Sequence, residues 1–327
     1  MTARITPTSG PLTAEQVRQF SARSSLTGAF HLGMHLGLAV VLAALLWRTW
    51  GSLWTPVLWC AVGVVINYLY AAQHELSHGT VFTSRRANEL WGRVIGLLML
   101  YPRDYDRHHH LRHHRYTGDP DQDAELAFRT PYTFRSYVLY GVGVTYWWGR
   151  MSAIWACARG QFDAYERPAT VARKLTLEAR IHLAIYAGIA VVSAATGSWL
   201  ALLVWLGPML TLKWTHQVQN TVEHTGMAMT ADLWNSTRTV RAPAPWRWLV
   251  WNMTFHTAHH AYPSVPFFRL PHLHSALVDT AGPPQTVTYL EFQRWVLGRL
   301  WKQPEANGAF DAVSDCRSPD ATPGTVT

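Results

Sequence analysis

Four histidine clusters occur in this sequence at spacings that suit metal binding. They are HELSH at 74–78, HLRHH at 110–114, NTVEH at 220–224 and HTAHH at 256–260. Residues i and i+4 share one face of a helix, so His74 and His78 can point at one ion. In an HxxHH pattern the i+3 residue lies beside the i+4 residue, so adjacent histidines can serve two neighbouring ions. Neutral imidazole is a good ligand for iron, zinc, copper and nickel.

The number of clustered histidines sets how many ions they can hold. The four clusters supply nine of them: His74, His78, His110, His113, His114, His224, His256, His259 and His260. A zinc site takes four ligands, and a catalytic zinc takes only three from the protein. Nine imidazoles instead suit two six-coordinate ions with room left for water or oxygen. Because protonation of so many crowded imidazoles would bring repulsion, the clustering predicts a centre of two metal ions.

The other histidines of the 17 in the chain fit this pattern less well. His31 and His35 also have the i, i+4 spacing, but we interpret them as an interfacial face at the start of an apolar segment. The remaining ones are expected to pack, to lie on the surface or to support the ligands: His108, His109, His182, His216, His272 and His274.

Two competing motifs overlap these clusters. HELSH matches the HExxH pattern of zinc metallopeptidases, in which Glu75 would be the general base. That interpretation needs two of the histidines and one further ligand, and it leaves the others unexplained. The run 119–123, DPDQD, resembles the start of an EF-hand loop. Ala124 and Thr130 stand where that loop needs Gly and Glu, so calcium binding is not expected.

Apolar segments indicate how the clusters are positioned. A spanning helix needs roughly 20 mostly apolar residues, and four segments qualify: 26–47, 53–72, 181–195 and 199–214. Two shorter segments at 90–101 and 137–148 contain or adjoin arginine, and we expect them to lie in the membrane interface. The sequence therefore predicts an all-α polytopic membrane protein with four transmembrane helices and a helical cap that carries the histidines.

Charge indicates the orientation of these helices. All 28 Lys and Arg residues except Arg48 lie outside the two short loops predicted on the external side. Since basic residues mark the cytoplasmic side, both termini and all four histidine clusters are expected there. The formal net charge of +8 then faces anionic lipid headgroups rather than nucleic acid. The excess of Arg over Lys hints at a GC-rich bacterial genome, so the membrane is expected to be a bacterial inner membrane.

Composition excludes several other classes of protein. The 327 residues are 49% hydrophobic, which excludes a disordered or collagen-like chain. Three widely spaced cysteines exclude a disulfide scaffold and a cysteine-ligated zinc module. We expect one membrane-embedded domain over 1–302 and a disordered tail over 303–327, which is rich in Pro, Ala, Asp, Ser and Thr. No secretory signal is expected before the first apolar segment.

Taken together, the motifs resemble those of the membrane fatty acid desaturase and hydroxylase superfamily. The resemblance runs from about 68 to 274 and rests on HELSH, HHLRHHRYTGDPDQDAE, NTVEH and NMTFHTAHHAYPSVPFFRLPHLH. The last stretch is similar to bacterial acyl-lipid desaturases, and NTVEHTG is similar to the NxxEHxG box of membrane alkane hydroxylases. The resemblance implies four spans beneath a cytoplasmic diiron site, with the nine histidines as ligands and Asn220 where desaturases hold a metal-bound water.

Polar residues near the clusters are candidates for supporting roles. A metal-bound imidazole usually donates its other N–H to a carboxylate or carbonyl, and four acids are placed to accept it: Glu75, Asp119, Asp123 and Glu223. Asn67 lies seven residues before His74, on the same helical face. A polar residue there predicts either a contact with a substrate channel or a helix–helix hydrogen bond.

The expected function is an O2-dependent diiron oxidoreductase that desaturates an acyl chain or another apolar or amphiphilic substrate. Its cofactors would be two Fe ions, with O2 as co-substrate and electrons from a separate ferredoxin- or cytochrome b5-like carrier. That carrier would dock on the basic cytoplasmic face by charge complementarity. The alternatives are a hydroxylase or ketolase of an alkane, carotenoid or sterol-like lipid, and a desaturase of a small biosynthetic metabolite. A membrane zinc metalloprotease using HELSH and a non-catalytic metal-binding or transport protein are more remote.

Overall fold

The computed structural model describes residues 11–302 apart from 120, 124, 126–132, 163–166 and 229. The predicted tail at 303–327 lies outside the described residues. The described chain is almost entirely helical, as predicted. It also contains a two-stranded parallel sheet, in which β1 (Thr239–Val240) pairs with β2 (Thr286–Val287).

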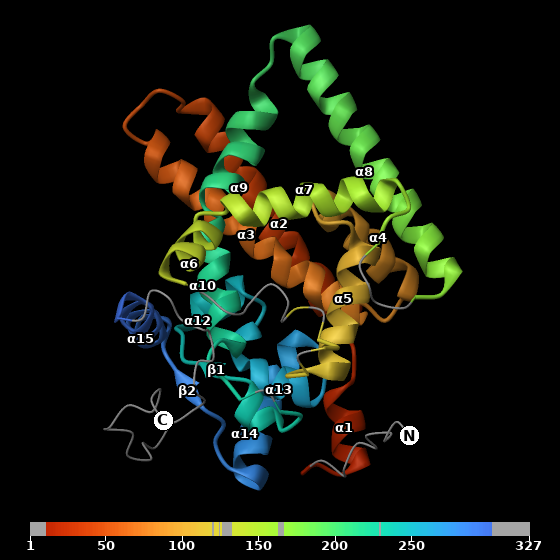
Figure 1. The fold of residues 1–327 in the computed structure, drawn as a ribbon, viewed down its shortest axis with the longest axis vertical. Coiled ribbons are helices and arrows are strands. Elements are labelled where there is room, and N and C mark those ends of the chain that lie inside the picture. The colour runs from red at the N-terminus through yellow and green to blue at the C-terminus, as the bar shows by residue number, and fades with distance from the viewer. Residues whose placement is uncertain are drawn as a thin grey trace.

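Three helices are long and apolar enough to cross a membrane, namely α2 (Ser25–Arg48), α3 (Thr55–His78) and α8 (Ala169–Thr196). The first agrees with the predicted segment 26–47 within a residue at each end. The second continues past the predicted 53–72, so the histidines of HELSH lie on the same helix as the apolar segment. The third begins well before the predicted 181–195. Figure 1 shows α8 rising to the top of the view, where the chain turns back toward α9.

The fourth predicted segment, 199–214, is not one uniform helix. It is divided into the π-helix η2 (Leu202–Leu206), α9 (Gly207–Thr211) and the start of α10 (Lys213–His224). Pro208 has no backbone N–H to donate to the preceding turn, which accounts for a change of helical geometry at this point. The predicted number of four spanning helices therefore rests on a broken segment.

Helices α3 and α9 pack closely because Gly63 has no side chain. A Cβ atom at Gly63 would lie 2.5 Å from the carbonyl oxygen of Pro208. Asn67, one turn later on α3, donates its side-chain Nδ2 to the carbonyl of Gly63 at 2.8 Å and to the carbonyl of Met209 at 2.9 Å. This contact fixes the broken segment against α3.

His31 and His35 join α2 to its neighbours. Both rings are buried. His31 Nε2 lies 3.0 Å from the carbonyl of Trp248, and His35 Nε2 lies 3.0 Å from the carbonyl of Val65. Trp251 donates its indole N–H to His35 Nδ1 at 3.0 Å. The two histidines therefore serve internal packing, and they do not form the interfacial face that we predict from their spacing.

The two short apolar segments that we expect in the membrane interface form helices, but these helices begin and end at other residues than predicted. The segment 90–101 corresponds to α4 (Arg85–Leu98). The segment 137–148 is divided between α6 (Phe134–Gly141) and α7 (Val144–Ala158). The division falls at Gly143, which has a φ of 87° and whose Cβ, if it had one, would lie 3.2 Å from Cβ of Lys213. This left-handed turn lets α7 lie across the view of Figure 1, against α8.

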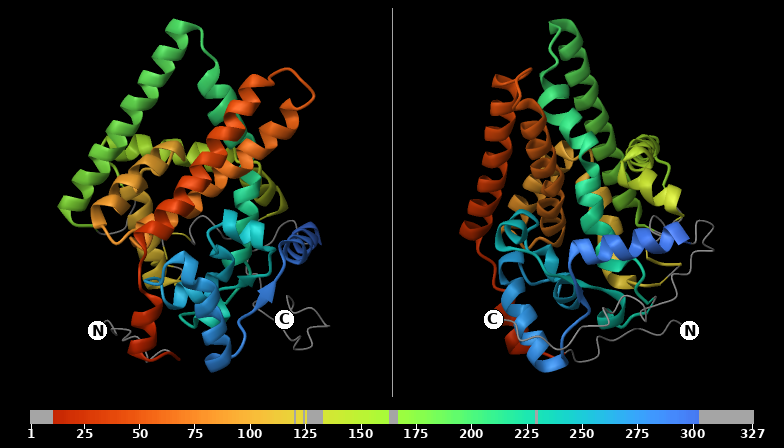
Figure 2. Two further views of the ribbon diagram at one scale, coloured as in Figure 1. Left: turned by 180° about the vertical axis from the view of Figure 1, so that it is seen from behind. Right: turned by 90° about the vertical axis from the view of Figure 1, so that its left-hand side faces the viewer.

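The remaining elements gather at the end of the molecule away from the α2–α3 turn, as both views of Figure 2 show. They are α1 (Ala14–Phe20), α5 (Arg103–Tyr116), α11 (Leu233–Ser236), α12 (Ala244–Leu249), η3 (Met253–Phe255), α13 (His256–Ala261), η4 (Phe267–Arg269), α14 (Leu270–Ala281) and α15 (Tyr289–Lys302). A continuous apolar core that includes Leu69, Leu76, Trp251 and Phe267 joins this end to α3. The ends of α3 and α10 are thereby held against α5 and α13.

Candidate metal centre

Four helices bring the nine predicted histidines into one buried region. His74 and His78 lie in the last two turns of α3, and His224 is the last residue of α10. The central helix α5 carries His110, His113 and His114, and α13 carries His256, His259 and His260. The described structure thus brings together every histidine of the predicted ligand set.

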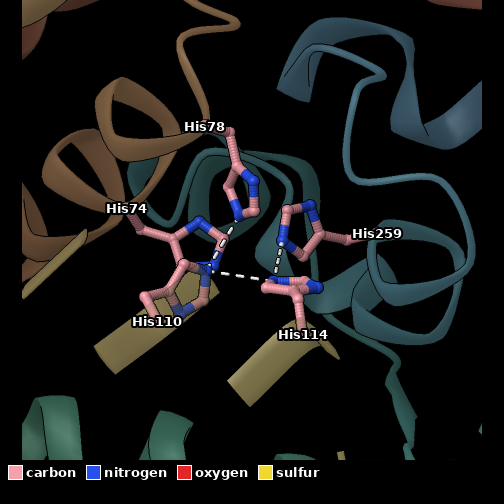
Figure 3. Close-up of side chains that lie close together, drawn as sticks. All are labelled: His74, His78, His110, His114 and His259. Carbon is pink, nitrogen blue, oxygen red and sulfur yellow. Dashed lines mark hydrogen bonds between the residues drawn. The ribbon is translucent and has the colours of Figure 1, made fainter. Parts of the chain in front are cut away.

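Five of the nine form a first group: His74, His78, His110, His114 and His259. One ring nitrogen from each lies within 4.8 Å of those of the others, and Figure 3 shows the five rings converging on a common space. The Nε2 atoms of His78 and His110 are 2.8 Å apart, and those of His110 and His114 are 3.0 Å apart. Nitrogens bound about 2.1 Å from one ion at right angles lie about 3 Å apart, so this spacing suits a shared ion.

The other four form a second group: His113, His224, His256 and His260. All are buried, and their ring nitrogens again lie within 4.8 Å of one another. The Nε2 atoms of His224 and His256 are 2.7 Å apart. Adjacent histidines separate between the groups, His114 from His113 and His259 from His260, as two neighbouring ions would require.

The histidines fit metal ions in their chemistry as well as in their spacing. The Nε2 atoms of His113 and His260 are buried and have no hydrogen-bond partner within the described part of the chain. A buried polar atom without a partner is costly, and an ion in the group of four, to which both histidines belong, would supply one. Burial lowers the pKa of His114, His259 and His260 well below the ordinary value, and neighbouring imidazoles lower it further. These rings are therefore neutral, which is the form that binds metal.

Two carboxylates hold histidines of α5 by their outer nitrogens. His113 Nδ1 lies 2.9 Å from both carboxylate oxygens of Asp123, as predicted for that acid. His110 Nδ1 lies 2.9 Å from Oε1 of Glu125, which is not among the four acids predicted from the sequence. Each contact turns the Nε2 atom of its ring toward the groups of histidines. The position of Glu125 inside the long motif that follows His109 is the signal that could have identified it.

Two further acids lie close to the groups at longer distances. Glu75 Oε1 is 3.7 Å from His74 Nδ1 and 3.8 Å from His259 Nδ1. Its other oxygen accepts hydrogen bonds from Thr80 Oγ1 and from the backbone of Phe267. Glu223 Oε1 lies 3.5 Å from His256 Nδ1. Both acids lie near outer nitrogens of the histidines, and their predicted role as acceptors for those nitrogens stays a prediction.

Asp119 does not have the role predicted for it. Its Oδ1 accepts hydrogen bonds from the backbone N–H groups of Asp121 at 2.9 Å and Gln122 at 3.1 Å. The side chain therefore stabilises the turn that presents Asp123, and within the described structure no hydrogen bond or ion pair joins it to any of the nine histidines.

A pocket opens beside both groups. Residues that line it include Tyr70, His74, His113, His216, Asn220 and His256. Asn220 thus has access to the space next to the histidines, while its predicted hold on a metal-bound water stays a prediction. His216, which we expect to be a packing or surface residue, also faces the pocket. Asn67 is not among the lining residues, and its bond to Met209 supports the helix–helix role over the channel role.

Comparison with known proteins agrees with these motifs. A family profile described as "Fatty acid desaturase" matches residues 48–292. Relatives include the sn-1 oleoyl-lipid 12-desaturase of Anabaena variabilis, 22% identical over 74% of this chain and 59% of the relative. The chloroplastic omega-6 fatty acid desaturase of Glycine max is 23% identical over 69% of this chain and 57% of its own length.

A third relative carries two activities in its name. The sphingolipid delta(4)-desaturase/C4-monooxygenase of Rattus norvegicus is 26% identical over 72% of this chain and 70% of the relative. The chain aligns with less than two thirds of the length of the relatives from Anabaena variabilis and Glycine max. Since the family profile covers most of the sequence, including all nine clustered histidines, this chain belongs to the fatty acid desaturase family and is an integral membrane protein.

Proposed function

We propose that this chain is an O2-dependent diiron oxidoreductase that desaturates an acyl chain or another apolar or amphiphilic substrate at the membrane. The observation that carries the proposal is the sorting of nine imidazoles into neighbouring groups of five and four. When two irons are bound, such a centre supplies an oxidant strong enough to remove hydrogen from an unactivated C–H bond. The protein supplies position and exclusion of water.

The residues around the histidines have defined tasks in this proposal. Asp123 and Glu125 orient the rings of His113 and His110 through their Nδ1 atoms. Burial of seven of the nine histidines keeps water away from the reacting bond. The pocket beside Tyr70 and Asn220 offers space for a substrate segment next to both groups.

We extend the proposal to the topology. The helical residues of η2 and α9 complete a fourth crossing, with the break at Pro208 inside it and α10 as its continuation toward the site. Four crossings place both termini on one side. The distribution of Lys and Arg favours the cytoplasmic side of a bacterial inner membrane, where the histidines would also lie.

Hydroxylation is the second candidate, because one relative is named as both a desaturase and a C4-monooxygenase. The two outcomes share the same metal centre, and the placement of the substrate decides between them. The zinc protease is disfavoured because Glu75 is fully buried and its Oε2 accepts hydrogen bonds from Thr80 and Phe267. A general base needs access to a metal-bound water.

Expression in a lipid-producing host tests the proposal. We expect mass spectrometry of lipids and polar metabolites to show a product that lacks two hydrogens, and metal analysis of the purified chain to give two irons. A product that instead gains one oxygen would assign hydroxylation. One zinc per chain, with no oxidised product, would contradict a diiron enzyme and revive the protease.

We propose that electrons come from a separate ferredoxin- or cytochrome b5-like carrier that binds basic side chains near the site, such as exposed Arg115 at the end of α5. Screening weakens attraction between exposed charges. We therefore expect turnover with an acidic carrier to fall as salt rises, while turnover with dithionite stays constant. A carrier-dependent rate that does not change with salt would contradict docking by charge.

A further inference from the structure

The segment that joins α12 to α13 has an unusual backbone geometry. Trp251 and Asn252 have φ values of 54° and 57°, and Leu100 is the one other non-glycine residue with positive φ in the described part of the chain. Asparagine tolerates this left-handed region, but a bulky residue such as tryptophan adopts it only when its surroundings hold it there. The turn at Trp251 therefore needs a stabilising contact.

A hydrogen bond from Trp251 to α2 supplies this contact, although the two partners are 216 positions apart in the chain. The indole N–H of Trp251 donates to His35 Nδ1 at 3.0 Å, and His35 Nε2 lies 3.0 Å from the carbonyl of Val65 on α3. An indole nitrogen can only donate, and a carbonyl can only accept. The ring of His35 is therefore neutral, with its proton on Nε2, and it links α3 to the turn.

Close packing around Trp251 adds to the effect of this bond. Trp251 and His35 are both 0% exposed. The ring of His31, one turn before His35, lies 4.5 Å from that of Trp251, and the ring of Phe267 lies at the same distance. Asn252, the second residue of the turn, donates its Nδ2 to the carbonyl of Phe267 at 3.1 Å. Because a close-packed interior transmits strain, a change at His35 is expected to reach the turn.

The turn leads directly into the helix that carries the last histidine cluster. The short helix η3 begins at the residue after Asn252 and continues into α13 at His256. Helix α13 contributes His259 to the group of five histidines, and it contributes His256 and His260 to the group of four. A rotation of α13 would therefore displace ligands of both ions at once.

We propose that His35 is a positioning residue for the metal centre. Through its hydrogen bond to Trp251 it holds the left-handed turn, and the turn fixes the orientation in which α13 presents its three histidines. Core filling alone does not require this pair, since apolar side chains of the same shape can replace a buried hydrogen-bonded pair at little cost. Helix α2 thereby supports the centre although it carries none of the nine histidines. The inference rests on the proposed function, because it takes these histidines to hold two ions.

Hydrogen–deuterium exchange of the purified full chain in nanodiscs tests the link between His35 and the turn. His35→Leu removes the imidazole, and Trp251→Phe removes the indole N–H but keeps an aromatic ring. We expect each variant to speed exchange of the backbone amides at 253–261 about tenfold, because each breaks the same buried hydrogen bond, and to leave 213–223 unchanged. The double variant should exchange no faster than the faster single variant. Unchanged exchange at 253–261 in both single variants would overturn the proposal.

Iron release to an excess of a coloured chelator tests the link between the turn and the ions. We expect His35→Leu and Trp251→Phe to lose both irons about tenfold faster than the unaltered protein, since α13 holds ligands of both groups. His35→Gln should retain most of the slow release, because its amide can accept from Trp251 and donate to the carbonyl of Val65. Release from His35→Gln as fast as from His35→Leu would show that the hydrogen bond is not what matters, and it would overturn the proposal.

His182→Leu is the matched control for both measurements. His182 is also a buried histidine of a spanning helix, and its Nδ1 lies 2.9 Å from the carbonyl of Glu178 on the same helix α8. We expect this variant to keep the exchange at 253–261 and the iron release of the unaltered protein, even if its thermal stability falls. Equal acceleration in His182→Leu and His35→Leu would mean a general loss of stability and would overturn the proposal. If circular dichroism shows that His35→Leu has not folded, Trp251→Phe decides.

The inference and the proposed function can fail separately. If the unaltered protein holds two irons and oxidises a substrate, but no variant changes exchange or iron release, the positioning role is wrong and the oxidoreductase stands. If exchange at 253–261 and iron release respond as expected but no substrate is ever oxidised, the positioning role stands and the proposed activity is wrong.

Discussion

Replacing His259 with alanine is expected to abolish substrate oxidation and to reduce the iron content from two to one or fewer per chain. His259 is fully buried on α13, and its Nε2 lies 3.1 Å from that of His114 in the group of five. Alanine would remove one of the five nitrogen donors of that group. The loss should exceed the roughly 10- to 100-fold that removal of an outer partner costs. Iron analysis and product formation measure it together.

His272→Ala is the matched control for this experiment. His272 lies exposed on α14, close in sequence to the last cluster but outside both groups of histidines. We expect that variant to keep two irons and full activity. If His259→Ala also retained both, His259 would not be a ligand.

Replacing Asp123 with asparagine is expected to reduce iron affinity or turnover by about 10- to 100-fold. Both carboxylate oxygens of Asp123 lie 2.9 Å from His113 Nδ1, and they also accept hydrogen bonds from the backbone of Gly118 and Glu125. Asparagine keeps the size but removes the charge that stabilises the N–H of the ring. Competition with a coloured iron chelator measures affinity, and product formation measures turnover.

Asp119→Asn distinguishes this effect from a change in the loop. Asp119 lies in the same turn and uses one oxygen to accept two backbone hydrogen bonds, which asparagine can still accept. We expect this variant to bind iron normally. An equal loss in both variants would mean that Asp123 acts by shaping the loop rather than by holding His113.

Some features of this protein follow from the sequence because they depend on local periodicity. The i, i+4 spacing of His74 and His78 needs only a helix to bring both rings to one face, and α3 provides it. The HxxHH pattern separates His113 from His114 for the same reason. Long apolar segments likewise predict helices wherever they occur, and α2 agrees with its predicted ends. The histidines that share a helix face and the presence of long helices could therefore be predicted without coordinates.

Other features depended on how distant segments pack, and only the tertiary structure decided them. The path of the loop after α5 assigns His113 to Asp123 and His110 to Glu125, and leaves Asp119 in a turn. The close approach of α9 to Gly63 gives Asn67 a backbone partner on another helix.

The cluster of Lys213 and Arg150 shows the same limit most clearly. The two residues are 63 positions apart, and each appears in the sequence as an ordinary basic residue near the end of an apolar segment. Hydropathy and spacing describe one segment at a time. The partners of a polar side chain are set by contacts between segments, so the tertiary fold decided that both side chains lie over the ring of Tyr146.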